Sequence, residues 1–231
     1  MKALIKCHLQ YLINKTTYLI LIAVIFFGIL MFVVNVFSLD TGIGYKENNE
    51  LYFQSSFTAV KMIAVFFSVF FACNSFSVKN DQYYYLITFH VSRSKYFVSK
   101  LFTVLILELL FMWILFVAHI FIGFVFYPKY TFNYDILVGY LNIWILMIYY
   151  GLISLICYLP IKNNYIIIVV FSFYILHMIV NENGGVVKSF INYFFLYLTE
   201  QGNFYYHFYH SMLSIIILFL LNFIVYLYID L

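Results

Sequence analysis

Six long apolar segments constrain this chain more than any other feature of its sequence. A helix needs about 20 mostly apolar residues to cross the hydrocarbon core of a bilayer, and each segment reaches or approaches that length. Only 9% of the 231 residues are charged, whereas a soluble domain carries about 25%. We therefore predict an all-α integral membrane protein, with residues 1–231 forming a single six-span membrane domain. The predicted spans are Thr17–Phe37, Phe57–Val78, Leu101–Tyr127, Ile136–Leu159, Tyr165–Val180 and Met212–Ile229.

The distribution of basic residues predicts the orientation of these spans. Cytoplasmic loops of membrane proteins are enriched in Lys and Arg. If the N-terminus is cytoplasmic, the outer loops hold only Lys46, Lys129 and Lys188, and Lys61 lies near the outer end of the second span. The remaining basic residues then lie on the inner side, so we expect both termini to be cytoplasmic. These inner residues are Lys2, Lys6, Lys15, Lys79, Arg93, Lys95, Lys100 and Lys162.

Two segments are neither spans nor ordinary loops. Residues 1–16 mix apolar residues with lysines and a histidine, a composition that favours a helix lying in the inner membrane interface. Residues 181–211 contain the apolar run "SFINYFFLYL", which is too short to cross a membrane. Irregular backbone at membrane depth requires cover from protein or a water-filled cavity. We therefore predict an outer re-entrant segment packed against the spans.

The connection between the second and third spans, residues 79–95, carries a short aromatic stretch followed by basic residues. Asn80 or Asp81 is a good helix N-cap, "QYYYLITF" reads as a short helix, and Ser92 or Ser94 can cap the next helix. Exposed aromatic surface beside Arg is typical of a protein interface. Attraction of the basic residues to anionic lipid is the alternative interpretation of this segment.

Glu108 lies in the run "ILELL", about one third of the way into the third predicted span from its inner side. Ionisable groups are costly in a membrane and often mark transport paths. We expect its carboxyl group to be neutral, or paired with Asn74, Asn142 or Asn222. Its role is either a contact along a translocation path, together with Asn142 and Asn222, or a helix–helix hydrogen bond. His119 and His177, towards the outer ends of their spans, are expected to pack at the membrane interface.

Motifs for catalysis and metal binding are lacking in the sequence. It has neither the phosphate-binding pattern GxxxxGK[ST] nor HExxH, so we expect no ATP hydrolysis by this chain. His207 and His210 lack a third ligand nearby in the sequence, so we interpret them as polar groups at the membrane interface and predict no metal site there. The odd set Cys7, Cys73 and Cys157 argues against a disulfide framework. No catalytic residues, metal or cofactor are therefore predicted in this chain.

The ordered layout of these segments resembles the permease subunits of type-2 ABC exporters. The resemblance spans the whole chain: an interfacial first helix, six spans, a cytoplasmic coupling helix in residues 79–95, and outer re-entrant structure in residues 181–211. The family's coupling loop commonly ends in a Ser-Arg step followed by Lys, as in Ser92, Arg93 and Lys100. This chain lacks the Pro that commonly precedes that serine. Its composition is similar to peptide exporters of low-GC Gram-positive bacteria, which include exporters of phenol-soluble modulins.

The resemblance implies a location in the bacterial plasma membrane and a set of partners. A second permease, identical or a paralogue, would pair with this chain, and separate ABC ATPase subunits would supply ATP and Mg. The substrate would be an amphipathic peptide or another hydrophobic molecule, and no nucleic acid is implied. The residues implied to contact the ATPase are Asp81, Tyr84, Leu86, Phe89, His90, Arg93 and Lys95.

Two other functions are compatible with the same spans. A non-transporting membrane protein, such as an immunity factor or an assembly scaffold, would need no ATPase. An intramembrane enzyme would need a catalytic group, for which Glu108 is the one candidate in the predicted spans. Loss of an activity on Glu108→Gln with assembly intact would favour the enzyme.

Overall fold

A computed structural model describes residues 2–12, 15–38, 45–77, 91–126, 134–183 and 204–228. Every regular element in these ranges is an α-helix, as the sequence predicts. The helices are α1 (Lys2–Leu12), α2 (Lys15–Ser38), α3 (Tyr45–Ser75), α5 (Arg93–Phe126), α6 (Tyr134–Ile161), α7 (Tyr165–Asn183) and α9 (Phe204–Tyr228).

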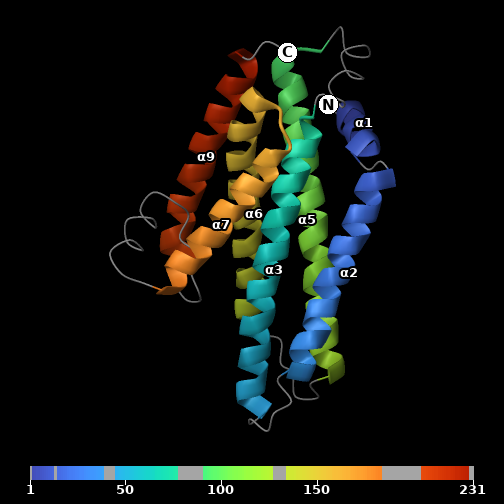
Figure 1. Ribbon diagram of the computed structural model, residues 1–231, viewed down its shortest axis with the longest axis vertical. Helices are drawn as coiled ribbons and strands as arrows, with labels where there is room; N and C mark the ends of the chain where they lie inside the picture. Colours follow the sequence, from blue (N-terminus) through green and yellow to red (C-terminus); the bar gives the residue numbers. More distant parts are fainter. Residues whose placement is uncertain are drawn as a thin grey trace.

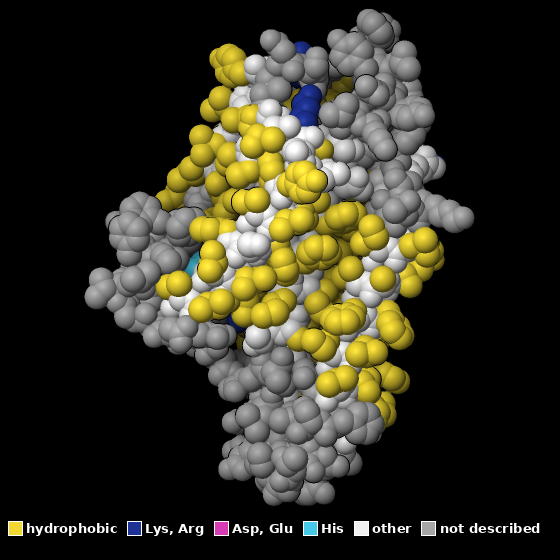
Figure 2. Space-filling model, in the orientation of Figure 1, with side chains coloured by type: hydrophobic (Ala, Val, Ile, Leu, Met, Phe, Trp, Pro, Cys, Tyr) yellow, Lys and Arg dark blue, Asp and Glu magenta, His cyan; other side chains and the backbone are white. Residues whose placement is uncertain are grey.

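The six longer helices form a bundle in which successive helices run in opposite directions (Figure 1). The short α1 lies beside one end of the bundle, which is also the end where α9 finishes (Figure 1). Apolar side chains cover much of the face drawn in Figure 2, whereas dark blue basic side chains gather mainly at its upper end. An apolar belt bounded by charge at one end is the surface expected of a helix bundle in a bilayer.

Four helices contain segments long and apolar enough to cross a membrane. They are Ser56–Ser75 in α3, Arg93–Phe126 in α5, Ile136–Ile161 in α6 and Ser211–Tyr228 in α9. The apolar parts of α2 and α7, Tyr18–Val34 and Tyr165–Val180, are shorter. The prediction of a helical membrane protein therefore holds, and four of the six predicted spans meet this criterion in full.

The helices extend beyond several predicted boundaries because a helix can continue past its apolar part. α3 begins at Tyr45, well before the predicted span start at Phe57. α7 continues to Asn183 and α9 begins at Phe204, so both ends of the predicted re-entrant segment 181–211 belong to these helices. The rest of that segment, residues 184–203, lies outside the described residues.

Local signals explain two of the helix ends. The amide of Tyr96 donates to the carbonyl of Ser92 at 3.1 Å, which makes Ser92 the residue that opens α5, one of the two caps expected. At the end of α6, Pro160 occupies the last turn and Lys162 follows with φ of 50°. The Lys162 amide donates to the Tyr158 carbonyl at 2.7 Å, so a left-handed residue closes the helix.

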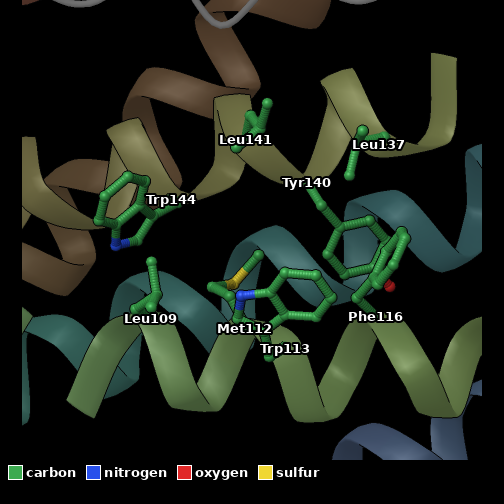
Figure 3. A pocket seen from close by; sticks show the side chains of 8 residues that line it. All are labelled: Leu109, Met112, Trp113, Phe116, Leu137, Tyr140, Leu141 and Trp144. Carbon is green, nitrogen blue, oxygen red and sulfur yellow. The ribbon is translucent and has the colours of Figure 1, made fainter. Parts of the chain in front are cut away.

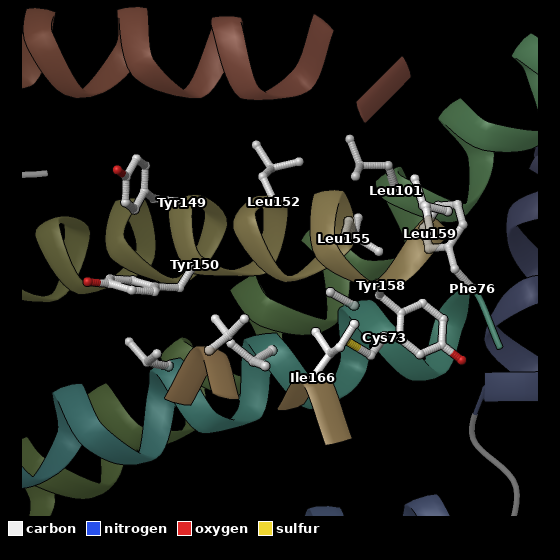
Figure 4. Close-up of a cluster of buried hydrophobic side chains, with 14 of the residues drawn as sticks. Cys73, Phe76, Leu101, Tyr149, Tyr150, Leu152, Leu155, Tyr158, Leu159 and Ile166 are labelled. Atoms are coloured by element: carbon white, nitrogen blue, oxygen red, sulfur yellow. The ribbon is translucent and has the colours of Figure 1, made fainter. Parts of the chain in front are cut away.

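The core consists of two groups of buried side chains on either side of a central pair, α3 and α6. We call the first the α7–α9 cluster, because α7 and α9 complete it (Figure 4). We call the second the α2–α5 cluster, because α2 and the C-terminal part of α5 complete it. Tyr149 and Leu152 point from α6 toward α9 in Figure 4. The α7–α9 cluster includes Val69, Cys73, Phe76, Phe97, Tyr150, Leu155, Tyr174 and Tyr226. The α2–α5 cluster includes Phe32, Tyr52, Phe67, Phe71, Phe111, Leu115, Tyr140 and Met147.

Candidate functional site: a buried carboxyl among three helices

The side chain of Glu108 lies in the centre of the bundle. α5 buries one face, and Glu108 shares that face with Val104, Phe111 and Leu115, at helical spacing. Only 1% of Glu108 is exposed, whereas its neighbour Leu110 is 52% exposed. The carboxyl group therefore points into the protein and away from the lipid-facing side of α5.

One serine is the hydrogen-bond partner of this carboxyl group. Ser68 of α3 is fully buried, and its hydroxyl is hydrogen-bonded to Glu108 Oε1. The same Oγ lies 2.6 Å from the backbone carbonyl oxygen of Met147 in α6. The Ser68 hydroxyl on α3 thus contacts both a side chain of α5 and a backbone carbonyl of α6.

A glycine on α6 makes room for this arrangement. A Cβ atom added at Gly151 would lie 2.6 Å from Ser68 Oγ and 3.4 Å from Glu108 Oε1. Any other residue at this position would displace the serine or the carboxyl. The requirement for glycine here is a close approach of side chains, with no need for an unusual backbone angle.

The second carboxyl oxygen, Glu108 Oε2, is buried and has no hydrogen-bond partner among the residues that the structure describes. The sequence predicts a neutral carboxyl group or one paired with a polar side chain, with Asn74, Asn142 and Asn222 as examples. The described partner is polar, but it is Ser68, which is not among those examples. The sequence did not distinguish Ser68 from many other hydroxyl residues. Only the register of α3 against α5 and α6 selects it.

Asn142 and Asn222, predicted with Glu108 as path residues, lie in other surroundings. Asn222 of α9 is fully buried, and its Nδ2 donates to the carbonyls of Leu152 in α6 and Leu218 in α9, each at 2.9 Å. It therefore anchors α9 to α6. Asn142 is half-buried on α6, and no described contact joins either asparagine to Glu108. The three residues do not form one polar group.

The predicted partner-binding segment is described only at its end. Asp81, Tyr84, Leu86, Phe89 and His90 lie outside the described residues. Arg93 and Lys95, in the first turn of α5, are exposed. Arg93 Nη1 also donates to the carbonyl of Leu227 at 3.3 Å, which ties the start of α5 to the end of α9.

A second contact joins the start of α5 to α1. Nε2 of His8 lies 2.9 Å from Ser99 Oγ, and that hydroxyl donates to the Tyr96 carbonyl at 2.8 Å. The hydroxyl hydrogen is therefore used, and His8 must be the donor in its own bond. Burial, followed by the nearby charge of Lys100, lowers the pKa of His8 to about 4. His8 is thus a neutral imidazole with its proton on Nε2 at neutral pH.

Lys100 lies deeper than the sequence suggested. The sequence places it with the basic residues of the inner side, and the structure leaves only 1% of it exposed. Its Nζ lies 4.6 Å from the ring centroid of Tyr96 and 5.0 Å from that of Phe76. Both aromatic faces stabilise the ammonium group. The basic patch at the start of α5 is therefore part surface and part core.

Two other buried histidines pair with tyrosines. His119 Nδ1 lies 2.9 Å from Tyr140 OH, and His177 Nδ1 lies 2.6 Å from Tyr150 OH. Both histidines are almost completely buried within the protein. That they pack at the depth of the membrane interface stays a prediction. A signal for His119 was present in the sequence: it continues the buried face of α5 one turn after Leu115.

An apolar groove opens between α5 and α6 (Figure 3). In Figure 3, Trp144 and Leu141 of α6 face Leu109 and Met112 of α5. The Trp144 Nε1 atom is buried and has no partner in the described part of the chain. The groove is lined by Leu109, Met112, Trp113, Phe116, Leu137, Tyr140, Leu141 and Trp144.

Among the described residues, no group of three or more His, Cys, Asp or Glu side chains could hold a metal ion. The side chains of His207 and His210 lie outside the described part. No protein-family model matches the chain, and no curated protein matches it either. The fold and the site thus define the class only as a helical membrane protein with a buried carboxyl in its core.

Proposed function

We propose that this chain is the permease subunit of an ATP-driven ABC exporter with six membrane spans and cytoplasmic termini, located in the bacterial plasma membrane. The observation that carries the proposal is the double attachment of the start of α5. It directly follows the basic, aromatic connection of residues 79–92, and it is bonded to α1 through Ser99 and to α9 through Arg93. A force applied to that connection would therefore reach three helices at once.

A separate ATPase would supply this force by gripping residues 79–95. Its Mg-ATP would bind outside this chain, whose sequence lacks a phosphate-binding loop. Two permease copies, identical or paralogous, would enclose the path of an amphipathic peptide or another hydrophobic substrate. Glu108, Asn142 and Asn222 would line that path once a movement of the helices opens the bundle around them.

The test is reconstitution of the chain with an ABC ATPase from the same organism, in inside-out vesicles. The probe is a fluorescent amphipathic helical peptide, whose ATP-dependent accumulation is measured. Arg93→Glu should weaken ATPase binding by more than about tenfold, because reversing an interface charge costs several kcal/mol. It should lower accumulation to a similar extent.

Lys162→Glu is the matched control, because it reverses a charge in the α6–α7 connection at the same end of the bundle. It should leave both ATPase binding and accumulation close to the parent values. If no detergent-stable complex forms and Arg93→Glu accumulates peptide normally, the transport proposal fails. A non-transporting scaffold or immunity protein then becomes the better interpretation.

A further inference from the structure

The hydrogen bonds around Ser68 contain one acceptor too many for an ionised carboxylate. The serine hydroxyl carries one hydrogen, yet its Oγ is within hydrogen-bonding distance of both Glu108 Oε1 and the Met147 carbonyl oxygen. A carboxylate and a carbonyl can only accept. If the carboxyl were ionised, one of the two close oxygen–oxygen contacts would therefore lack a hydrogen.

We propose that Glu108 is a proton-binding site. The proton resides on Oε1 and is donated to Ser68 Oγ, and the Ser68 hydroxyl is in turn donated to the carbonyl oxygen of Met147. This assignment gives each short contact one hydrogen. It forms a directed chain from α5 through α3 to α6.

The surroundings of the carboxyl group favour a proton over a negative charge. Glu108 is 1% exposed, and its Oε2 has no partner among the described residues. An ionised carboxylate in such a place costs several kcal/mol unless it is paired with a cation or several donors. Its hydrogen-bond partner Ser68 is uncharged, and so are Gly151 beside the carboxyl and the Met147 carbonyl beside that serine.

The geometry also favours a proton over a metal ion. The same three oxygens are of the type that bind hard cations. However, ions of this kind bind oxygen at roughly 2.3–2.6 Å. Two oxygens that share such an ion are ordinarily farther apart than two oxygens joined by a hydrogen bond. Ser68 Oγ and the Met147 oxygen are 2.6 Å apart, so the space between them fits a shared hydrogen.

The proton chain lies where the two core clusters meet. In α3, Ser68 follows Phe67 of the α2–α5 cluster and precedes Val69 of the α7–α9 cluster. The protonated carboxyl thus fastens α5 to the central pair α3 and α6. Any movement of α5 away from that pair must break the chain, and loss of the proton would place a charge inside the core.

Infrared spectroscopy of the full chain in lipid nanodiscs at neutral pH tests the proposal without substrate or ATPase, and so independently of the proposed function. Protonated carboxylic acids have a C=O stretch that is separate from the carboxylate bands. We expect this acid band in the parent, shifted in D₂O and lost in Glu108→Gln. Glu200→Gln, a residue in a predicted outer loop, should keep it.

Ser68→Ala should retain the acid band but move it to higher frequency, because the carboxyl loses its hydrogen-bond acceptor. If Glu108→Gln instead removes a carboxylate pair of bands, the proposal is overturned. A carboxylate band that moves when Na⁺ replaces K⁺ would overturn it in favour of a cation. Should Glu108→Gln fail to fold, the ¹³Cδ chemical shifts of the parent labelled with ¹³C-glutamate report the same protonation state.

Discussion

The two core clusters are built on the same central helices and both contain hydrogen bonds between helices, but their aromatic rings pack differently. In the α7–α9 cluster, each outer helix has a hydrogen bond to α6: His177 with Tyr150 at 2.6 Å, and Asn222 with the Leu152 carbonyl at 2.9 Å. The α2–α5 cluster has such a bond as well, between His119 of α5 and Tyr140 of α6 at 2.9 Å. It also contains a close stack of rings, with the Phe67 and Phe111 centroids 3.9 Å apart and their planes at 8°.

The difference follows from how much of each helix is buried. Only 17% of the apolar window of α9 is buried, against 39% for α5. Lipid is as apolar as a leucine side chain, so burying more leucines does not hold a helix in a membrane bundle. A helix with little buried surface therefore depends on a few directional bonds, whereas α5 adds close packing of aromatic rings to its bonds with Ser68 and Tyr140.

The largest expected effect is that of Phe111→Ala in the α2–α5 cluster. Phe111 is 2% exposed and stacks on Phe67, so its removal leaves a cavity. We expect the free energy of unfolding to fall by about 3–5 kcal/mol, measured by denaturant titration in mixed micelles. Leu110→Ala on the lipid-facing side of the same turn should change it by less than about 1 kcal/mol. Equal losses would contradict the packing account.

The next largest loss of stability is expected for Gly151→Ala, at the boundary between the two clusters. Gly151→Ala forces a methyl group to within 2.6 Å of Ser68 Oγ, and we expect a loss of about 1–3 kcal/mol from overpacking. Gly28→Ala is the matched control. Its added Cβ would meet the end of the Leu115 side chain at 2.8 Å, and that flexible group can move. Thermal unfolding of both variants should show a clearly lower midpoint only for Gly151→Ala.

A smaller effect is expected for Asn222→Ala, which removes the bond from α9 to the Leu152 carbonyl. Hydrogen bonds between membrane helices average about 0.6 kcal/mol, with larger values near 1.7. Hydrogen exchange of the α9 amides should rise while that of α2 does not change. A uniform rise over all helices would mean that α9 is not anchored separately.

The smallest effect is local to α1, whose Leu4 and Cys7 contact one cluster and whose Leu12 belongs to the other. His8 is neutral in the folded protein until the pH approaches about 4, whereas an ordinary histidine gains its proton near pH 6.5. The stability that it contributes is therefore complete above pH 6.5 and is lost as the pH falls toward about 4.

We expect hydrogen exchange of α1 to increase over that pH window, after correction for the intrinsic pH dependence of exchange. His8→Gln keeps a donor for Ser99 but has no proton to gain, so its α1 should show no such increase. An identical increase in both proteins would assign the change to another group.

Much of the fold could be predicted from apolar length alone. The ends of α6 and the start of α7 fall within two residues of the predicted span ends, because Pro160 and the polar residues Lys162–Asn164 interrupt the apolar pattern there. The start of α3 could not be predicted in this way. Its first turns are polar, and hydropathy reports where a helix is apolar, whereas the helix itself begins earlier at Tyr45.

The residues of the candidate site also fall into two groups, those that could be predicted from the sequence and those that could not. Glu108 could be found because a lone carboxyl in an apolar run is costly. Ser68 and Gly151 could not, because small residues are common in apolar helices and their significance lies in the register of three helices. The burial of Lys100 could not be predicted either, because a positive charge near a span end ordinarily faces the surface, and here two aromatic rings contact it.

The attachment of α5 to both α1 and α9 has a consequence for how the protein is made. Arg93 is synthesised long before Leu227, whose carbonyl it contacts, whereas the His8 contact to Ser99 can form as soon as α5 emerges. The contact between α1 and α5 can therefore form during translation, whereas the contact between α5 and α9 forms only after α9 has been synthesised. Until then, the guanidinium group of Arg93 must be satisfied by water or lipid phosphate.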